Sequence, residues 1–509
     1  MKNKLVIIFL IILGSIFYIL TIRGALGTSK TPNELTKLSS LGQPFESSHE
    51  RASYALTSSF LLDHSLVLSK AWADFGSPDV GYANGKFYSF FPPGVSFSII
   101  PLYLLGQRFG FIQLGAFFTI ALFAIGVLIF LYLICRNIFK LSQMYSILAA
   151  IVFGFSTTSW SYAITVYQHL PTTFFLISSF YLVWKYKNSE RSGWPWAVLV
   201  WFMYGISIFF DYPNALLLLP IMFYFLFSSF DFKKSADKLS IKFRVTILIT
   251  FIVFIALAAL HLYYNQSLYG SWKKIGQSSN FQRYRIGDYE QLIQKRADFQ
   301  AAPTVTTSDQ IFKEDLIING GFTLLFGPDK GIFLFSPILL LGLFGIFEIR
   351  KKLNMEYGVL IAILLVNLLI YASFGDPWGG WAYGPRYLIP SMAVLSILAV
   401  IWLAQNSRII IRRVIFFLLF AYSAAIALLG VITTNVVPPK IEAIPLHLPY
   451  YNFLLNYHLL RNGVTSNFIY TTYLSNHFSL LTYFLIIYSL LLLVILFILI
   501  NLPRREYDN

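Results

Sequence analysis

Apolar segments long enough to cross a lipid bilayer recur along the whole sequence and constrain its fold more than any other feature. An α-helix of about 20 residues spans the roughly 30 Å of hydrocarbon in a bilayer. Of the 509 residues, 57% are hydrophobic and 12% are charged, which is about half the charged share of a soluble domain. Soluble, intrinsically disordered, collagen-like and disulfide-framework proteins are therefore excluded.

The sequence predicts an all-α integral membrane protein, a single polytopic domain over residues 1–509 with about twelve transmembrane helices. These helices are expected at residues 5–22, 110–134, 144–164, 169–186, 194–210, 213–229, 245–264, 331–347, 357–374, 387–404, 409–435 and 478–501. The N-terminus has the charged start of a signal peptide, but its apolar run is too long for a typical one. We interpret it as an uncleaved first helix; cleavage at Ala25-Leu26-Gly27 is the weaker alternative.

The distribution of charge orients these helices. With the N-terminus in the cytoplasm, the inside segments hold 20 basic and 7 acidic residues, and the outside segments hold the other 18 basic and 16 acidic residues. Short, densely basic inside loops are what the positive-inside rule requires. Both termini are then cytoplasmic, and the net charge of +15 needs no nucleic-acid partner to explain it.

Three long loops fall outside the membrane in this topology, at residues 23–93, 265–330 and 436–477. Loops of this length usually carry function or small helices of their own. Residues 51–62 and 288–300 alternate polar and apolar positions at helical spacing, which predicts helices lying in the interface plane. The activity is therefore expected on the extracytoplasmic face of a multi-pass cell-membrane protein.

The available chemistry is limited. The single cysteine, Cys135, lies in an apolar run and is expected to be buried, so an internal disulfide and cysteine-based metal clusters are excluded. Glu50, Asp79 and Asp211 lack metal-ligand spacing, and no metal or other cofactor is predicted. No span carries a charged residue at mid-depth, which disfavours a transporter.

The first outer loop contains two candidate catalytic acids, Glu46 and Glu50. A carboxylate just beyond the first helix is well placed to take a proton from an acceptor hydroxyl or amine. If Tyr54 opens a helix, Glu50 lies one turn before it on the same face. The plainer interpretation is that both acids are solvated loop residues. Asn84-Gly85 predicts a turn farther along this loop.

Ordered motifs give a resemblance. The pattern E-x-x-x-Y-A from Glu50, followed by N-G-x-x-Y-x-x-x-P-P from Asn84, resembles the first outer loop of GT-C glycosyltransferases. The most similar groups are the protein O-mannosyltransferases and aminoarabinose transferases. The segments G-P-D-K-G from Gly327, W-G-G-W from Trp378 and G-P-R-Y from Gly384 extend the resemblance over residues 40 to 390.

The resemblance implies a multi-helix core that uses a polyprenyl-phosphate sugar outside the membrane, with an acid of the first outer loop as base. Glu50 matches that base, where the family more often has aspartate, and Glu46 is the competitor. The family often places a lysine just before the Pro-Pro pair, where this chain has Phe90 and Phe91; Lys86 is the nearby substitute.

Outer cations are the candidates for holding the donor phosphate. Arg386 leads because a guanidinium fork fits phosphate in a bidentate way. The other candidates are Lys330, Lys86, Arg51 and His169. Contact with lipid headgroups is the alternative role for these residues.

The candidates for sugar or acceptor contact are Tyr54, Asp79, Tyr88, Asp211, Trp378, Trp381 and Tyr387. The two tryptophans also fit the aromatic belt of a membrane interface. Asp211 also fits the N-cap of the helix that follows it.

These residues and the resemblance together predict a hexosyl- or mannosyl-type glycosyltransferase of the cell envelope. It is expected to move a sugar with inversion from polyprenyl phosphate to a protein, glycan or lipid acceptor. Two alternatives remain open: a secondary transporter, and an enzyme like the O-antigen ligases and polymerases that uses a polyprenyl-diphosphate donor.

Overall fold

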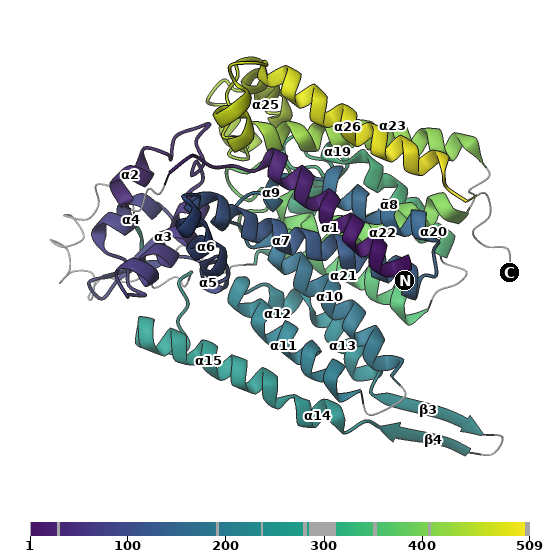
Figure 1. Cartoon of the computed structure of the whole chain (residues 1–509). Helices are drawn as coiled ribbons and strands as arrows, with labels where there is room; N and C mark the ends of the chain where they lie inside the picture. The colour runs from purple at the N-terminus through teal and green to yellow at the C-terminus, as the bar shows by residue number, and fades with distance from the viewer. Residues whose placement is uncertain are drawn as a thin grey trace.

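The computed structural model describes residues 2–27, 31–189, 193–235, 238–277, 282–284, 312–349, 354–405 and 409–503. The predicted helix at 288–300 lies outside these residues. A bundle of apolar helices fills most of the molecule, and smaller elements cluster beyond one end of it (Figure 1).

The bundle consists of α1 (Lys2–Thr21), α7 (Ile112–Leu133), α8 (Gln143–Phe155), α10 (His169–Lys187), α11 (Trp194–Phe210), α12 (Asn214–Leu217), α13 (Leu219–Phe227), α14 (Thr246–Thr250), α15 (Ile252–Tyr269), α19 (Ile332–Phe335), α20 (Leu340–Ile349), α21 (Met355–Ala372), α22 (Ile389–Gln405), α23 (Ile410–Ile432) and α26 (Leu480–Ile500). The smaller elements are α2 (Pro32–Thr36), α3 (Ser48–Leu62), α4 (Lys70–Gly76), β1 (Val80–Ala83), β2 (Lys86–Ser89), α5 (Gly94–Ser98), α6 (Ile100–Phe109), α9 (Ser159–Ala163), β5 (Gln282–Tyr284), α18 (Ile317–Phe326), α24 (Lys440–Ala443) and α25 (Asn452–Arg461). At the opposite end a hairpin of β3 (Phe230–Ser235) and β4 (Lys238–Phe243) extends from the bundle (Figure 1).

Seven helices in the described part of the chain are long and apolar enough to cross a membrane. Every one of the predicted ranges contains helix, although the exact number of spans stays a prediction. The range 144–164 is broken after Phe155, and the range 331–347 is broken at Pro337, whose ring removes a helical hydrogen bond. Cys135 is buried, as predicted.

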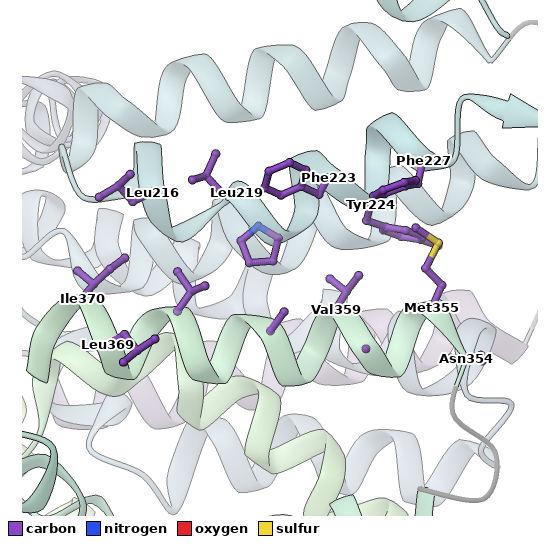
Figure 2. Close-up of a pocket in the computed structure, with 14 residues that line it drawn as sticks. Leu216, Leu219, Phe223, Tyr224, Phe227, Asn354, Met355, Val359, Leu369 and Ile370 are labelled. Carbon is purple, nitrogen blue, oxygen red and sulfur yellow. The ribbon is translucent and has the colours of Figure 1, made fainter. Parts of the chain in front are cut away.

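An apolar groove of about 880 Å³ runs between α12–α13 and α21. Leu216 and Phe223 point into it from one side, and Val359 and Ile370 point into it from the other (Figure 2). The lining of α21 runs from Met355 to Ile370, about 24 Å at 1.5 Å per residue, which is most of the hydrocarbon thickness of a bilayer.

A second apolar groove, of about 320 Å³, lies between α1, α6 and α7. Ile22, Leu105 and Phe109 are among the residues that line it.

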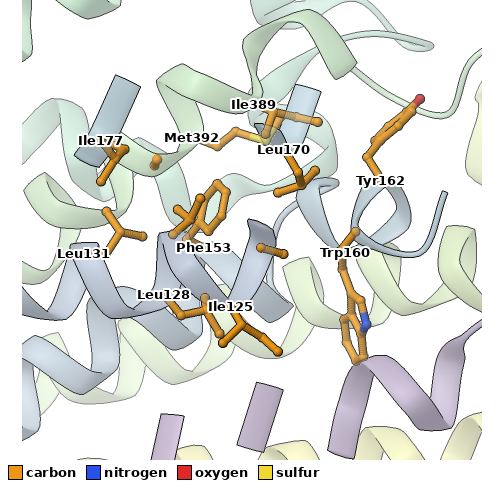
Figure 3. Packing of buried hydrophobic residues seen from close by; sticks show 14 of the residues in the cluster. Ile125, Leu128, Leu131, Phe153, Trp160, Tyr162, Leu170, Ile177, Ile389 and Met392 are labelled. Carbon is orange, nitrogen blue, oxygen red and sulfur yellow. The ribbon is translucent and has the colours of Figure 1, made fainter. Parts of the chain in front are cut away.

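The centre of the bundle is built from α7, α8, α10 and α22. Side chains of these four helices interdigitate, among them Leu128, Phe153, Ile177 and Met392 (Figure 3). Helices α20 and α22 approach closely through glycine: a Cβ added at Gly345 would lie 2.2 Å from the carbonyl oxygen of Leu398. Small residues permit such backbone contact between membrane helices.

The outer loops contain a small antiparallel sheet of order β2-β1-β5, which the all-α prediction did not include. Asn84 and Gly85 have φ angles of 52° and 76° and form the predicted turn between β1 and β2. A two-residue hairpin turn of this kind requires positive φ angles, which asparagine and glycine tolerate best.

The predicted helix at 51–62 is present as α3, but it begins earlier, at Ser48, because the chain leaves its extended conformation after Ser47. Glu50 and Tyr54 both lie within α3, four residues apart, so they share a face of this helix. Ten of its 15 residues are buried, so α3 is a packed element of the outer region and holds Glu50 in its first turn.

Candidate active site

The two acids of the first outer loop have different surroundings. The Glu46 carboxylate accepts a hydrogen bond from Arg23 Nη1 at 2.6 Å, another from Thr434 Oγ1 at 2.6 Å, and one from the Gly42 backbone at 3.2 Å. Glu46 thus ties the end of α1 to the end of α23. Neither oxygen of Glu50 has a hydrogen-bond partner within the described residues.

Glu50 is fully buried, with a relative exposure of 0%. Burial raises the pKa of its carboxyl group to about 8; the charge of Arg23 opposes this rise and the charge of Glu46 adds to it. The Ser47 backbone N–H favours the ionised form without completing a hydrogen bond. A carboxyl group whose pKa lies close to neutral pH is suited to act as a general base.

An aromatic stack connects Glu50 to Arg386. The His49 ring lies between Phe91 and Tyr167, with centroid distances of 3.7 and 4.3 Å. The Arg386 guanidinium carbon lies 5.3 Å from the ring centroids of both Tyr167 and Tyr387. Tyr167 interacts electrostatically with both Arg386 and Glu50, so both charged side chains lie in its neighbourhood.

Arg386 lies at the start of η5 (Arg386–Leu388), immediately before α22. It forms no ion pair in the part of the chain that the structure describes, and its Nε has no hydrogen-bond partner there. His169, the first residue of α10, is buried and meets Tyr387 edge-on at 5.9 Å. A guanidinium without a carboxylate partner is available to an anionic ligand.

Asp211 belongs to the same cluster. It is buried, which raises the pKa of its carboxyl group to about 7, while the Gln168 side chain and the Arg386 charge oppose the rise. Its predicted N-cap role is wrong, because Pro213 occupies the N-cap of α12 and no side chain caps that helix.

Lys330 is also near Arg386, but it is occupied with the backbone. Its Nζ donates to the carbonyl oxygen of Gly380 at 3.3 Å and to that of Ala382. Burial and the charge of Arg386 lower the pKa of Lys330 to about 7. Lys330 therefore fixes the loop that leads into Arg386.

Two other predicted cations, Arg51 and Lys86, have different surroundings. The Arg51 guanidinium donates to the backbone carbonyls of Phe45, Glu46, Phe75 and Ser77, so it holds the loop together. Its charge acts on the neighbouring Glu50, but its hydrogen bonds are taken up by the backbone. Lys86 is exposed at the β1–β2 turn.

Most of the predicted sugar-contacting residues are engaged elsewhere. Asp79 accepts a hydrogen bond from Ser48 at 2.5 Å, and Tyr54 packs against Phe45. Tyr88 meets Tyr269 edge-on at 5.3 Å. The exposed Trp381 donates to Glu442 at 2.5 Å, and Trp378 is half-buried. Tyr387 alone among these aromatic residues contacts Arg386 in the described structure.

Three residues of the site were not predicted: Arg23, His49 and Tyr167. Arg23 carried a signal that would have found it, since a basic residue directly after the first span opposes the positive-inside rule. The sequence contains no sign that His49 and Tyr167 belong to the site, because His49 precedes α7 in the chain and Tyr167 follows it, and only the fold brings their rings together.

The family model of dolichyl-phosphate-mannose-protein mannosyltransferases matches residues 92–261, about a third of the chain. The match includes Tyr167, His169 and Asp211, whereas Glu50 and Arg386 lie outside it.

Two solved structures are similar to this chain over most of its length. ArnT from Cupriavidus metallidurans, bound to undecaprenyl phosphate, has a TM-score of 0.48 at 11% identity, with 97% of this chain and 77% of that chain covered. The Archaeoglobus fulgidus oligosaccharyltransferase has a TM-score of 0.44 at 11% identity, with 86% of this chain and 56% of that chain covered. No curated protein sequence matches the chain.

Proposed function

We propose that this protein transfers a sugar from a polyprenyl-phosphate donor to an acceptor on the extracytoplasmic face, with inversion, and that Glu50 is the general base. The donor's phosphate meets Arg386, with Lys330 as the second cation. The sugar is a hexose of the mannose type.

The observation that supports this proposal most is where the groove along α21 ends. Its lining finishes at Leu369 and Ile370. The next residue, Tyr371, stacks on Tyr387 with a centroid distance of 4.3 Å. The Arg386 guanidinium carbon in turn lies 5.3 Å from the centroid of the Tyr387 ring. The apolar groove, which is nearly as long as a bilayer is thick, thus ends near Arg386, a cation with no ion pair in the described structure. A lipid with a long apolar chain and a phosphate head fits both parts.

The chemistry follows from the placement of the two charges. The acceptor hydroxyl or amine attacks the anomeric carbon while the bond from that carbon to the phosphate oxygen breaks. Glu50 takes the acceptor's proton, and the departing polyprenyl phosphate keeps the electron pair of the broken bond. Arg386 stabilises the charge that develops on the phosphate; a preorganised cation in a poorly solvated site contributes several kcal/mol to such a step.

The test is a transfer assay with the full chain in proteoliposomes, radiolabelled undecaprenyl-phosphate hexoses and a cell-envelope extract as acceptor. The expected result is transfer from the monophosphate donor. Glu50→Gln should lower the rate by about 10² to 10⁴, since that is the usual contribution of a general base. The matched control is Glu314→Gln, at an exposed acid of the outer loops.

Three outcomes would contradict the proposal. Retained transfer in Glu50→Gln would show that Glu50 is not the general base. Use of diphosphate donors alone would favour a ligase- or polymerase-like enzyme. Sugar uptake into proteoliposomes without any lipid-linked donor would favour a transporter.

A further inference from the structure

A buried arginine, Arg23, is paired with Glu46, which lies four residues before the proposed base. Arg23 has a relative exposure of 0%, as does Glu50. Its Nη1 is bound to Glu46, but its Nε and Nη2 have no partner within the described residues, and neither do the two oxygens of Glu50. Buried donors and acceptors left open in this way are rare, because each costs free energy.

The backbone around Arg23 is held on both sides. Arg23 forms a β-bridge with Asn467, the Phe468 N–H donates to the Ile22 carbonyl at 2.8 Å, and the Gly24 N–H donates to the Ser466 carbonyl at 3.3 Å. These contacts join the end of α1 to the third outer loop. The guanidinium is therefore fixed in place rather than free to swing toward water.

The partner of Arg23 is fixed as well. Besides Thr434 Oγ1, the Asn435 backbone N–H donates to Glu46 Oε1 at 3.2 Å. One positive and one negative charge thus stand in constant positions near Glu50, outside the reach of bulk solvent.

We propose that the Arg23–Glu46 pair sets the protonation state of Glu50, with Arg23 favouring the carboxylate and Glu46 opposing it. This inference rests on the proposed function in one respect, namely that Glu50 is the base. Arg23 acts through Glu50 and is a positioning residue.

Four groups from different elements interact electrostatically with Glu50. Arg23 at the end of α1 favours its ionisation, and Arg51 on α3 does so to a smaller degree. Glu46 opposes ionisation, and Tyr167 before α10 interacts with Glu50 without carrying a charge at neutral pH. Arg51 is already bound to four carbonyls. A single substitution in the Arg23–Glu46 pair, in contrast, removes one of two opposite charges and so changes the balance of charge around Glu50.

The test follows the carboxylic C=O stretching band of Glu50 by infrared spectroscopy during a pH titration of the full chain in lipid nanodiscs. Glu50→Gln removes this band and so identifies it. Arg23→Gln should raise the midpoint of the titration by about 1 to 3 pH units, the usual effect of removing a nearby opposite charge. Glu46→Gln should lower it, and Arg23→Lys, which keeps the charge, should leave it close to the wild-type value.

The double variant Arg23→Gln, Glu46→Gln covers the case in which a single change unfolds the protein. It removes both charges together and leaves no unpaired one buried. Its midpoint should lie above that of the wild type, because the effect of Arg23 on Glu50 exceeds that of Glu46.

An unchanged midpoint in Arg23→Gln, or shifts of the same sign in Arg23→Gln and Glu46→Gln, would overturn the inference. A purely structural role would lower the melting temperature and leave the midpoint where it is. The band does not depend on turnover, so the proposed function is decided separately, by transfer in Glu50→Gln.

Discussion

At the scale of the residue, the central feature is the Glu50 carboxyl group, which is buried and has no hydrogen-bond partner among the residues that the structure describes. Such a group destabilises the folded protein, and functional sites commonly carry groups of this kind. Glu46, four residues earlier, is also buried, but both of its carboxylate oxygens accept hydrogen bonds. The two glutamates of this loop thus have separate roles: Glu46 holds the loop in place, and the carboxyl group of Glu50 remains available for chemistry.

The raised pKa of Glu50 has a consequence for stability. Glutamate loses its proton near pH 4.5 in the unfolded chain and near pH 8 in the folded one, so between these values the folded state binds more protons. Stability therefore falls as the pH rises through this window, by on the order of 5 kcal/mol in full. Glutamine has no proton to lose. Glu50→Gln should melt at a higher temperature than the wild type in detergent, with a gain that grows from about pH 5 to pH 8.

Differential scanning fluorimetry across this range checks the expectation, with Glu314→Gln as the exposed control. A gain that is equal at every pH, or a lower melting temperature at pH 8, would show that Glu50 titrates normally.

Sequence alone could not choose between Glu46 and Glu50. The choice depends on Arg23 and Thr434, which reach Glu46 from 23 and 388 residues away. The resemblance to GT-C proteins favoured Glu50 by its distance from Tyr54. Arg386 was predicted from its charge and its place before a span, but its contact with Tyr167 is visible only in three dimensions.

At the scale of the element, hydropathy predicted where the helices lie because burial in lipid demands long apolar runs. It did not predict the small sheet, since β5 pairs with β1 across about two hundred residues. The break after Phe155 was missed for a related reason: the residues on both sides of it are apolar enough to continue one helix.

The groove along α21 gives the element-scale prediction. An added Cβ at Gly358 would meet no atom within 4 Å, and this glycine lines the groove. Gly358→Trp should therefore fill the groove and weaken binding of undecaprenyl phosphate by about tenfold or more, since losing 1.4 kcal/mol already has that effect. Gly358→Ala should bind normally and melt no lower, because alanine favours a helix by about 1 kcal/mol over glycine.

Native mass spectrometry of the purified chain with undecaprenyl phosphate measures this binding. Equal affinity in Gly358→Trp and Gly358→Ala would place the lipid outside the groove along α21.

At the scale of the whole molecule, the site is assembled at one end of the bundle from parts far apart in the chain. Arg23, Glu50, Tyr167 and Arg386 come from the end of α1, the start of α3, the turn before α10 and the start of α22. The positive-inside rule predicts that this end faces away from the cytoplasm.

Cysteine labelling tests that orientation. Cys135 is the only cysteine and is buried, so the background is low. Lys86→Cys and Asn188→Cys each add one thiol at an exposed position, at opposite ends of the bundle. A membrane-impermeant maleimide should label Lys86→Cys in intact cells and Asn188→Cys only after permeabilisation. The reverse pattern would place the site in the cytoplasm.

The most direct measurement is a cryo-electron microscopy structure of the full chain with undecaprenyl phosphate. We expect the phosphate within hydrogen-bonding distance of the Arg386 guanidinium and the polyprenyl chain in the groove between α12–α13 and α21. A phosphate remote from Arg386, with its chain in the groove between α1, α6 and α7, would contradict the account.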